Sequence, residues 1–270
     1  MKVNILGCGG SAGVPRIGNL WGACDPNNEK NRRTRASVFL ETRYDGVDFR
    51  ILIDSGPDLR TQFLRHGLAT LDAVLYTHAH ADHLNGIDEL RLVNRATGKV
   101  LPAYGNEETI REISTRFGYV FEPPDQDNRF FKPCLKKHII SGGFSIKKSG
   151  SLLPVMAIPQ DHGGVTTLGF RIGDFAYSVD LRAMSEAGFE RLRGVQCWVV
   201  DCYSYAPHPT HSHLDQTLDW IERVGPKRAI LTHMPETLDY EALLTRCPEG
   251  VVPAYDGMTL SLPDLEFRPG

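Results

Sequence analysis

The chain has 270 residues, of which 41% are hydrophobic and 23% are charged, as in an ordinary globular protein. This composition excludes a collagen-like protein, a coiled coil and a mostly disordered chain. The 30 Lys and Arg residues and 33 Asp and Glu residues give a formal net charge of −3, which provides no general attraction to nucleic acid or anionic lipid. We therefore expect neither a membrane nor a stable nucleic-acid partner.

The predicted strands are short β-branched or aromatic runs, separated by turn residues and by helix-like segments. Two of the intervals, Asp45-Gly46 and Gly173-Asp174, are typical of tight hairpins. This pattern predicts a mixed α/β (α+β) fold with some antiparallel strand pairs. Strands are predicted at residues 3–6, 37–41, 49–53, 73–76, 155–158, 167–172, 175–179, 197–200, 229–231 and 259–260.

Four segments between these runs carry apolar residues at helical spacing and have a cap or a stop signal. Gly67 and Gly225 are predicted to end helices that contain Leu59 and Leu214. Asn106 and Ser185 are predicted to cap the other two helices at their first turns.

No linker rich in Gly, Ser or Pro divides the chain, so we predict a single domain over residues 1–270. Two stretches, 9–36 and 121–137, show no regular pattern. Long irregular loops in compact domains are frequently functional, and we expect these two to form walls of a cleft.

The cysteines are scattered and contain no C-x-x-C pair, and no apolar run reaches the length of a membrane span. The first residues also lack the pattern of a secretory signal. We therefore expect reduced thiols and a cytoplasmic location. The six cysteines are Cys8, Cys24, Cys134, Cys197, Cys202 and Cys247.

The sharpest motif is Thr-His-Ala-His-Ala-Asp-His at residues 77–83, directly after the apolar run at 73–76. In extended backbone, His78, His80 and Asp82 project to the same side, and His83 can join them as the chain turns. Three imidazoles and a carboxylate would carry a large unpaired polar cost together if no ion neutralised them. The motif therefore predicts a site for a divalent metal ion.

This H-x-H-x-D-H pattern resembles the signature of the metallo-β-lactamase superfamily. The superfamily's remaining ligands match His162, Asp180 and His233, each of which follows a predicted strand, and Asp54 fits its early D-x-G element. The resemblance covers nearly the whole chain and implies a four-layer αβ/βα sandwich. It implies seven metal ligands: His78, His80, Asp82, His83, His162, Asp180 and His233.

This ligand set resembles that of the superfamily's dinuclear hydrolases, which implies two divalent ions that share Asp180. Zinc or manganese is expected, and iron and nickel also accept these ligands. Two ions that share a ligand can polarise a bridging hydroxide, which would attack phosphorus. The resemblance therefore gives Asp180 and Asp82 catalytic roles.

A second group of histidines, His208, His211 and His213, precedes the helix that begins near Leu214. In related phosphodiesterases, the histidine immediately before this helix contacts the phosphoryl group or protonates the leaving oxygen. His213 matches that position best, so it is expected to be catalytic and to bind substrate. His211 and Tyr203 are expected to be further substrate contacts.

The glycine-rich segment at residues 7–15 and the Tyr-Asp-Gly-Met segment at 255–258 resemble the phosphoribosyl 1,2-cyclic phosphate phosphodiesterase branch. That branch often has a cysteine cluster in the early loop, where this chain has only Cys24 beyond Cys8. The sequence leaves open whether Cys24 binds a structural metal and whether Arg33 or Arg35 contacts substrate.

The resulting prediction is a dinuclear phosphodiesterase for a small cyclic phosphodiester, such as a ribose or nucleotide cyclic phosphate. Two alternatives have the same fold: an RNA 3′-processing nuclease and a thioester hydrolase. A third is a metal-bound protein that binds without hydrolysing. The exact substrate, the physiological metal and a homodimer are left open by the sequence.

Overall fold

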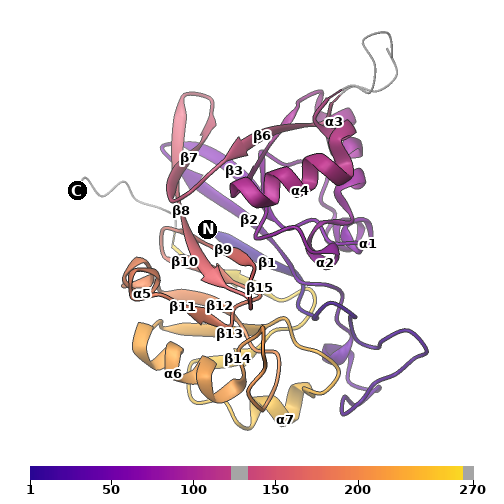
Figure 1. The fold of residues 1–270 in the computed structure, drawn as a ribbon, viewed down its shortest axis with the longest axis vertical. Coiled ribbons are helices and arrows are strands. Elements are labelled where there is room, and N and C mark those ends of the chain that lie inside the picture. Colours follow the sequence, from indigo (N-terminus) through magenta and orange to yellow (C-terminus); the bar gives the residue numbers. More distant parts are fainter. Residues whose placement is uncertain (123–132, 264–270) are drawn as a thin grey trace.

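The structure is a computed structural model and describes residues 1–122 and 133–263. Two β-sheets pack face to face, and helices cover the outer face of each (Figure 1). Helices α1–α4 lie on the first sheet, and α5–α7 lie on the second (Figure 1).

The first sheet has seven strands in the order β15-β1-β2-β3-β4-β5-β6. A two-residue turn at Asp45-Gly46 joins β2 to β3, whose pairing ends at Tyr44 and Val47. From β3 to β6 the neighbouring strands are parallel. The strands are β1 (Lys2–Gly7), β2 (Ser37–Tyr44), β3 (Val47–Ile53), β4 (Ala73–Leu75), β5 (Leu101–Gly105), β6 (Leu135–Ile139) and β15 (Thr259–Ser261).

The second sheet has eight strands, in the order β11-β8-β9-β10-β12-β13-β14, with β7 paired to β8. Strands β10, β12, β13 and β14 are parallel, so their carboxyl ends lie at one edge. The strands are β7 (Gly143–Lys148), β8 (Ser151–Asp161), β9 (Thr166–Ile172), β10 (Phe175–Ser178), β11 (Ala183–Met184), β12 (Cys197–Asp201), β13 (Arg228–Thr232) and β14 (Val251–Pro253).

Helices α2, α3 and α7 are not predicted from the sequence, whereas the four predicted helices have the expected cap or stop residue. Gly67 and Gly225 adopt left-handed backbone after α1 and α6, and the side chains of Asn106 and Ser185 cap α4 and α5. The α-helices are α1 (Leu59–His66), α2 (Ala81–Leu84), α3 (Leu90–Thr97), α4 (Glu107–Phe117), α5 (Glu186–Leu192), α6 (Leu214–Val224) and α7 (Tyr240–Leu244); short 3-10 turns are η1 (Glu29–Asn31), η2 (Ile87–Glu89) and η3 (Gly118–Val120).

Side chains that alternate along each strand belong to two different hydrophobic clusters, one between the sheets and one under the helices. Phe39 of β2 belongs to a buried cluster with Phe63 of α1 and Leu90 of α3. Its neighbour Leu40 belongs to the larger cluster that includes Phe170 of β9 in the second sheet. Because successive side chains point to opposite faces, each sheet buries one face against the other sheet and one against helices. The predicted four-layer αβ/βα sandwich is confirmed.

All ten predicted strands are present, but five further strands are not predicted from the sequence: β5, β6, β7, β11 and β14. The second irregular stretch is therefore shorter than expected, because β6 begins at Leu135; residues 123–132 lie outside the described residues. Residues 9–36 are irregular apart from η1, as expected. None of the described helices is long and apolar enough to cross a membrane.

Candidate metal centre

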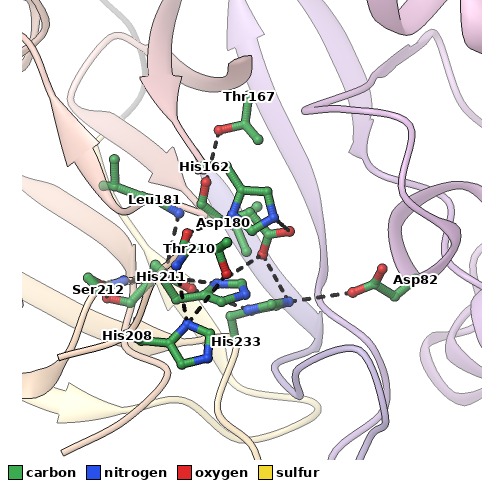
Figure 2. Close-up of polar contacts among 12 residues, drawn as sticks. Asp82, His162, Thr167, Asp180, Leu181, His208, Thr210, His211, Ser212 and His233 are labelled. Atoms are coloured by element: carbon green, nitrogen blue, oxygen red, sulfur yellow. Dashed lines mark hydrogen bonds and ion pairs between the residues drawn. The ribbon is translucent and has the colours of Figure 1, made fainter. Parts of the chain in front are cut away.

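The predicted ligands converge because each follows the end of a strand. His78 lies three residues after β4, His162 follows β8 directly, and His233 follows β13 directly. Asp180 lies two residues after β10. Strands from both sheets therefore deliver polar side chains to one edge of the sandwich (Figure 2).

The His-x-His-x-Asp-His motif is not a continuous extended stretch, which corrects the expectation from the sequence. Strand β4 ends at Leu75, and His80 is the N-cap of the short helix α2. Asp82 and His83 therefore lie on a helical turn. The turn brings His83 Nε2 to 3.2 Å from Asp82 Oδ2, so the two side chains still face a common point.

Three groups of candidate ligand atoms include Asp180, and in each group all the atoms lie within 4.8 Å of one another; the third, formed by Asp180, Asp201, His211 and His233, shares Asp180 and His233 with the second. His78 Nε2 lies 3.0 Å from Asp180 Oδ2, and His233 Nε2 lies 3.0 Å from Asp180 Oδ1. Each oxygen of the carboxylate is therefore closest to a different group, and Oδ2 also lies 3.5 Å from His83 Nε2 of the second group. The first group is His78, His80, His162 and Asp180; the second is Asp82, His83, Asp180 and His233.

The donor atoms fit divalent cations. His78 Nε2, His83 Nε2, His233 Nε2 and Asp180 Oδ1 are buried and have no hydrogen-bond partner among the described residues. Buried polar atoms without partners are costly, and imidazole and carboxylate are the usual ligands of zinc and related ions. An ion in each of the first two groups would satisfy the atoms that the protein leaves unpaired.

A second layer of hydrogen bonds orients these imidazoles. The buried Asp54 accepts bonds from the Thr77 backbone N–H and hydroxyl, both at 2.8 Å, and contacts His83 Nδ1 at 2.8 Å. The Thr77 hydroxyl lies 3.0 Å from His78 Nδ1. Such contacts fix the ring orientation and leave Nε2 for a metal. The sequence places Asp54 in a motif, and the structure adds this orienting contact.

Asp54, Asp180 and His233 have left-handed backbone, with φ of 63°, 51° and 61°. This region is costly for residues other than glycine, although Asp and Asn adopt it more readily than most. Strained conformations of this kind persist where the surrounding structure holds them, and they cluster at functional sites. The fold therefore stores backbone strain at the residues that meet in the centre.

The first two groups differ in charge. Burial lowers the pKa of His78 to about 4, so its imidazole is neutral at pH 7. Burial also acts to lower the pKa of His233, but the carboxylates of Asp180, Asp201 and Asp82 raise it to about 10. Without a metal ion, His233 therefore holds a proton at pH 7 and His78 does not. The carboxylates of Asp82, Asp180 and Asp201 therefore favour a positive charge at the second group, which a proton or a metal ion can supply.

His211, rather than His213, lies beside the centre, which corrects the position expected from the sequence. His211 is buried, and its Nδ1 lies 3.7 Å from Asp180 Oδ1 and 3.5 Å from Asp201 Oδ2 (Figure 2). Tyr203 stacks on the His211 ring with centroids 4.2 Å apart. Tyr203 and His211, which the sequence predicts to contact substrate, therefore both lie beside the centre.

His213 is the N-cap of α6, and its backbone carbonyl accepts a hydrogen bond from Thr217. None of the described residues forms a hydrogen bond, ion pair or ring contact with its side chain. The short bridge between Ser204 and His213 holds this end of the loop, and the intervening turn directs His211 inward. The position of His213 next to α6 therefore determines its backbone conformation. It does not give the imidazole ring a contact in the centre.

Asp201 is a member of the site that sequence reasoning missed. It ends β12, is fully buried, and lies 3.3 Å from His233 Nδ1 as well as beside His211. The backbone N–H of Ser212 donates to its Oδ2 at 3.2 Å. The signal in the sequence is a carboxylate that directly follows a buried apolar run, as Asp180 and Asp54 also do.

The early loop does not carry a third metal cluster among the described residues, since none of the candidate groups contains Cys24. The Cys24 thiol points to the Leu238 carbonyl at 3.5 Å. Arg33 is buried and donates to Asn31 Oδ1 and the Pro235 carbonyl, both at 3.1 Å, so these bonds hold the loop. Arg35 pairs with Asp58 at 3.0 Å.

Two hollows adjoin the centre. The first, which we call the acidic hollow, has a volume of about 330 Å³ and is lined by His78, Ala79, His80, Ala81, Glu108, Thr109, Glu112, Arg116, Val165 and Thr166. The second, which we call the glycine-loop hollow, has a volume of about 280 Å³ and is lined by Gly10, Ser11, Ala12, Gly13, Arg16, Tyr203, Ser204, His208, Pro235, Glu236 and Thr237.

Comparison with known proteins agrees with this arrangement. Residues 49–234 match the family model described as a beta-lactamase superfamily domain. The crystal structure of a diphosphatase of the PhnP family superposes with a TM-score of 0.82 at 34% identity, and the match covers 96% of each chain.

Two curated proteins are also similar. The anti-Pycsar protein Apyc1 of Paenibacillus harenae is 30% identical over 70% of this chain and 80% of its own length. An octanoyltransferase of Porphyromonas gingivalis is 30% identical over 99% of this chain, which spans only 53% of that protein. The chain is therefore a member of the β-lactamase superfamily.

Proposed function

We propose that the protein hydrolyses a small phosphodiester with two divalent ions, held by His78, His80, His162 and Asp180 and by Asp82, His83, Asp180 and His233. The observation that carries this proposal is the position of Asp180, whose Oδ2 lies 3.0 Å from His78 Nε2 and whose Oδ1 lies 3.0 Å from His233 Nε2. A pair of ions in these positions would activate water and offset the charge that builds on phosphoryl oxygens.

The protein's own residues supply the remaining parts of the reaction. Asp201 contacts His211 Nδ1 at 3.5 Å, so it can hold the imidazole by this nitrogen and leave Nε2 for the substrate. His211 then donates a proton or hydrogen bond to a phosphoryl or leaving oxygen, the role expected from the sequence for His213. Tyr203, which stacks on His211, limits the movement of the ring.

The similarity to a diphosphatase at 34% identity favours a second candidate function, hydrolysis of a diphosphate bond. Both reactions transfer a phosphoryl group to water and need the same positive charge and the same acid. They differ in the leaving group, which is an alcohol oxygen in a diester and a phosphate oxygen in a diphosphate.

The test is a substrate panel with protein reconstituted with zinc or manganese. We expect turnover of bis-p-nitrophenyl phosphate and of a nucleoside cyclic phosphate, and none of S-lactoylglutathione or short RNA. Preference for a dinucleoside diphosphate would favour the second candidate. Turnover of the thioester or the RNA alone would contradict the proposal, and absence of any turnover would leave a binding protein.

A further inference from the structure

One cation of the early loop is buried without a carboxylate partner. Arg33 is only 2% exposed, forms no ion pair with any residue that the structure describes, and has no hydrogen-bond partner there for its Nε. A buried charge is costly unless it is paired, so arginine is rarely buried to this extent without a carboxylate. The guanidinium instead bonds uncharged oxygens, and these oxygens show what it holds in place.

This guanidinium joins the early loop to the segment that follows the metal ligand His233. Nη1 donates to the Pro235 carbonyl and Nη2 donates to Asn31 Oδ1, both at 3.1 Å. Asn31 Oδ1 also accepts a hydrogen bond from the Tyr240 N–H at 2.9 Å. The guanidinium and the amide therefore hold both ends of the segment between β13 and α7, which lies beside the early loop (Figure 1).

Backbone hydrogen bonds hold the same segment from the glycine-rich part of the early loop. The Met234 N–H donates to the Cys8 carbonyl at 2.9 Å, and the Gly10 N–H donates to the Met234 carbonyl at 3.3 Å. The N–H groups of Val14 and Arg33 donate to each other's carbonyls, at 2.8 and 2.9 Å. The two residues that follow the ligand are therefore bonded both by this backbone and by the guanidinium.

His233 needs such support because its backbone is strained. Its φ of 61° is left-handed, a conformation that residues other than glycine rarely adopt and keep only where the surrounding structure holds it. Its imidazole faces two carboxylates, with Nε2 3.0 Å from Asp180 Oδ1 and 3.6 Å from Asp82 Oδ2. A shift of the following turn would move Nε2 away from these oxygens.

The first metal group is held by other contacts. The Thr77 hydroxyl lies 3.0 Å from His78 Nδ1, and the Thr210 carbonyl lies 2.7 Å from His162 Nδ1. Among the described residues, Arg33 forms no hydrogen bond with any of these four. The structure therefore connects Arg33 to the second group and not to the first.

We propose that Arg33 is a positioning residue for the second metal group. It holds the turn after His233 so that the imidazole stays directed at Asp180 and Asp82, and it thereby sets the affinity of this group for a divalent ion. The inference rests on the two-ion centre of the proposed function and is independent of which substrate the enzyme hydrolyses.

The test measures the affinity of each group for zinc separately, by titration in competition with a chromophoric chelator. His80→Ala disables the first group and leaves the second, whereas His233→Ala disables the second and leaves the first. Arg33→Met, added to each, removes the donors and keeps an unbranched side chain. With His80→Ala it should raise the dissociation constant by about 10- to 100-fold, the usual cost of losing a residue that orients a metal ligand. With His233→Ala the constant should change by less than about threefold.

The matched control is Arg171→Met. Arg171 is also partly buried, and its Nη1 donates to the backbone carbonyls of Arg191 and Arg193 at 2.7 and 2.8 Å, but it belongs to none of the metal groups. Its substitution should leave both dissociation constants unchanged. Cobalt(II) provides a spectroscopic readout: with His80→Ala, substitution of Arg33 should alter the visible absorption of the bound ion, and substitution of Arg171 should not.

A second variant keeps the test decisive if Arg33→Met folds poorly. Arg33→Lys keeps the charge but replaces the planar pair of donors with one compact ammonium, so its dissociation constant should lie between those of Arg33 and Arg33→Met. Equal losses of affinity in both backgrounds would show a merely structural role and would overturn the inference. Unchanged affinity of the second group in both variants would overturn it as well.

The two proposals fail in distinguishable ways, because the titration uses no substrate. If wild-type enzyme binds two ions and hydrolyses no phosphodiester, only the proposed function is wrong. If it hydrolyses bis-p-nitrophenyl phosphate and the Arg33 variants lose no affinity at the second group, only this inference is wrong. A wild-type protein that binds a single ion would contradict both.

Discussion

The two hollows beside the metal centre differ in the elements that line them and in their charge. The acidic hollow lies against helix α4, whose exposed Glu108 and Glu112 form no ion pair with any described residue. In the glycine-loop hollow, the carboxylate of Glu236 is paired with Arg16. Since both adjoin the same Asp180-centred groups, we expect an anionic substrate to favour the glycine-loop hollow over the acidic hollow, where two carboxylates outnumber the single cation of Arg116. The comparison indicates that the residues around the metal ligands, rather than the ligands themselves, determine from which side a substrate approaches.

The largest effect is expected at the residue that both groups share. Asp180→Asn removes the charge but tolerates the left-handed backbone, so the fold should persist while activity falls on the order of 10³-fold. The matched control is Asp45→Asn, since Asp45 also has positive φ, 50°, and lies in an exposed hairpin turn. Steady-state turnover with metal analysis checks this. Full activity in Asp180→Asn would show that Asp180 is not a shared metal ligand.

The next comparison is between two histidines two residues apart. His211→Ala should lower kcat on the order of 10²-fold, because it removes a candidate general acid. His213→Ala should change kcat by less than about threefold, as expected for a surface substitution without partners. Thermal melting of both variants controls for folding. A larger loss in His213→Ala than in His211→Ala would restore the role expected from the sequence.

The free energy of unfolding should depend on pH through the buried carboxyl group of Asp256. Burial raises the pKa of Asp256 to about 6, although its oxygens accept bonds from Thr34 and Cys8. The folded protein therefore favours the protonated carboxyl, and this contribution to stability is present below the unfolded pKa of 3.8 and lost as pH rises through 6. The loss is about 2 to 3 kcal/mol.

Denaturant unfolding of wild type and Asp256→Asn between pH 4 and pH 7 measures this effect. The wild-type free energy of unfolding should fall relative to the variant across this range, whatever the variant's absolute stability. A constant difference between the two proteins would show that Asp256 titrates alike in the folded and unfolded states.

The smallest effect is expected in the acidic hollow. The double variant Glu108→Gln/Glu112→Gln removes two exposed negative charges, so KM for an anionic diester should fall by about two- to fivefold at low salt. Salt screens exposed charges, and the difference should vanish near 1 M salt. Steady-state kinetics at several ionic strengths checks this. A rise in KM would indicate that these carboxylates contact the substrate.

The resemblance to the superfamily's ligand pattern identifies most of the centre from the sequence, and strand order explains why its members meet. Asp180, His162 and His233 each follow an apolar run, and carboxyl ends of strands gather at one edge of a sheet. The hairpin at Asp45-Gly46 and the cap at Asn106 depend on neighbouring residues alone, and both are confirmed.

The features that the sequence does not predict depend on tertiary contacts. Strands β5 and β14 contain Pro102 and Pro253, which weaken a strand pattern, and pairing with neighbouring strands holds them. The choice of His211 over His213 follows from the turn after Tyr203, whose shape the spacing of three histidines does not reveal. Single-domain organisation, cytoplasmic location and the oligomeric state stay predictions.

The most direct test of a two-ion centre at Asp180 is the metal content of the purified protein. Elemental analysis after reconstitution with zinc or manganese should give about two equivalents of metal per polypeptide, with His80→Ala and His233→Ala each reducing the content by about one. Fewer than about one equivalent in the wild-type protein would contradict the account, because the two groups around Asp180 would then not hold a pair of ions.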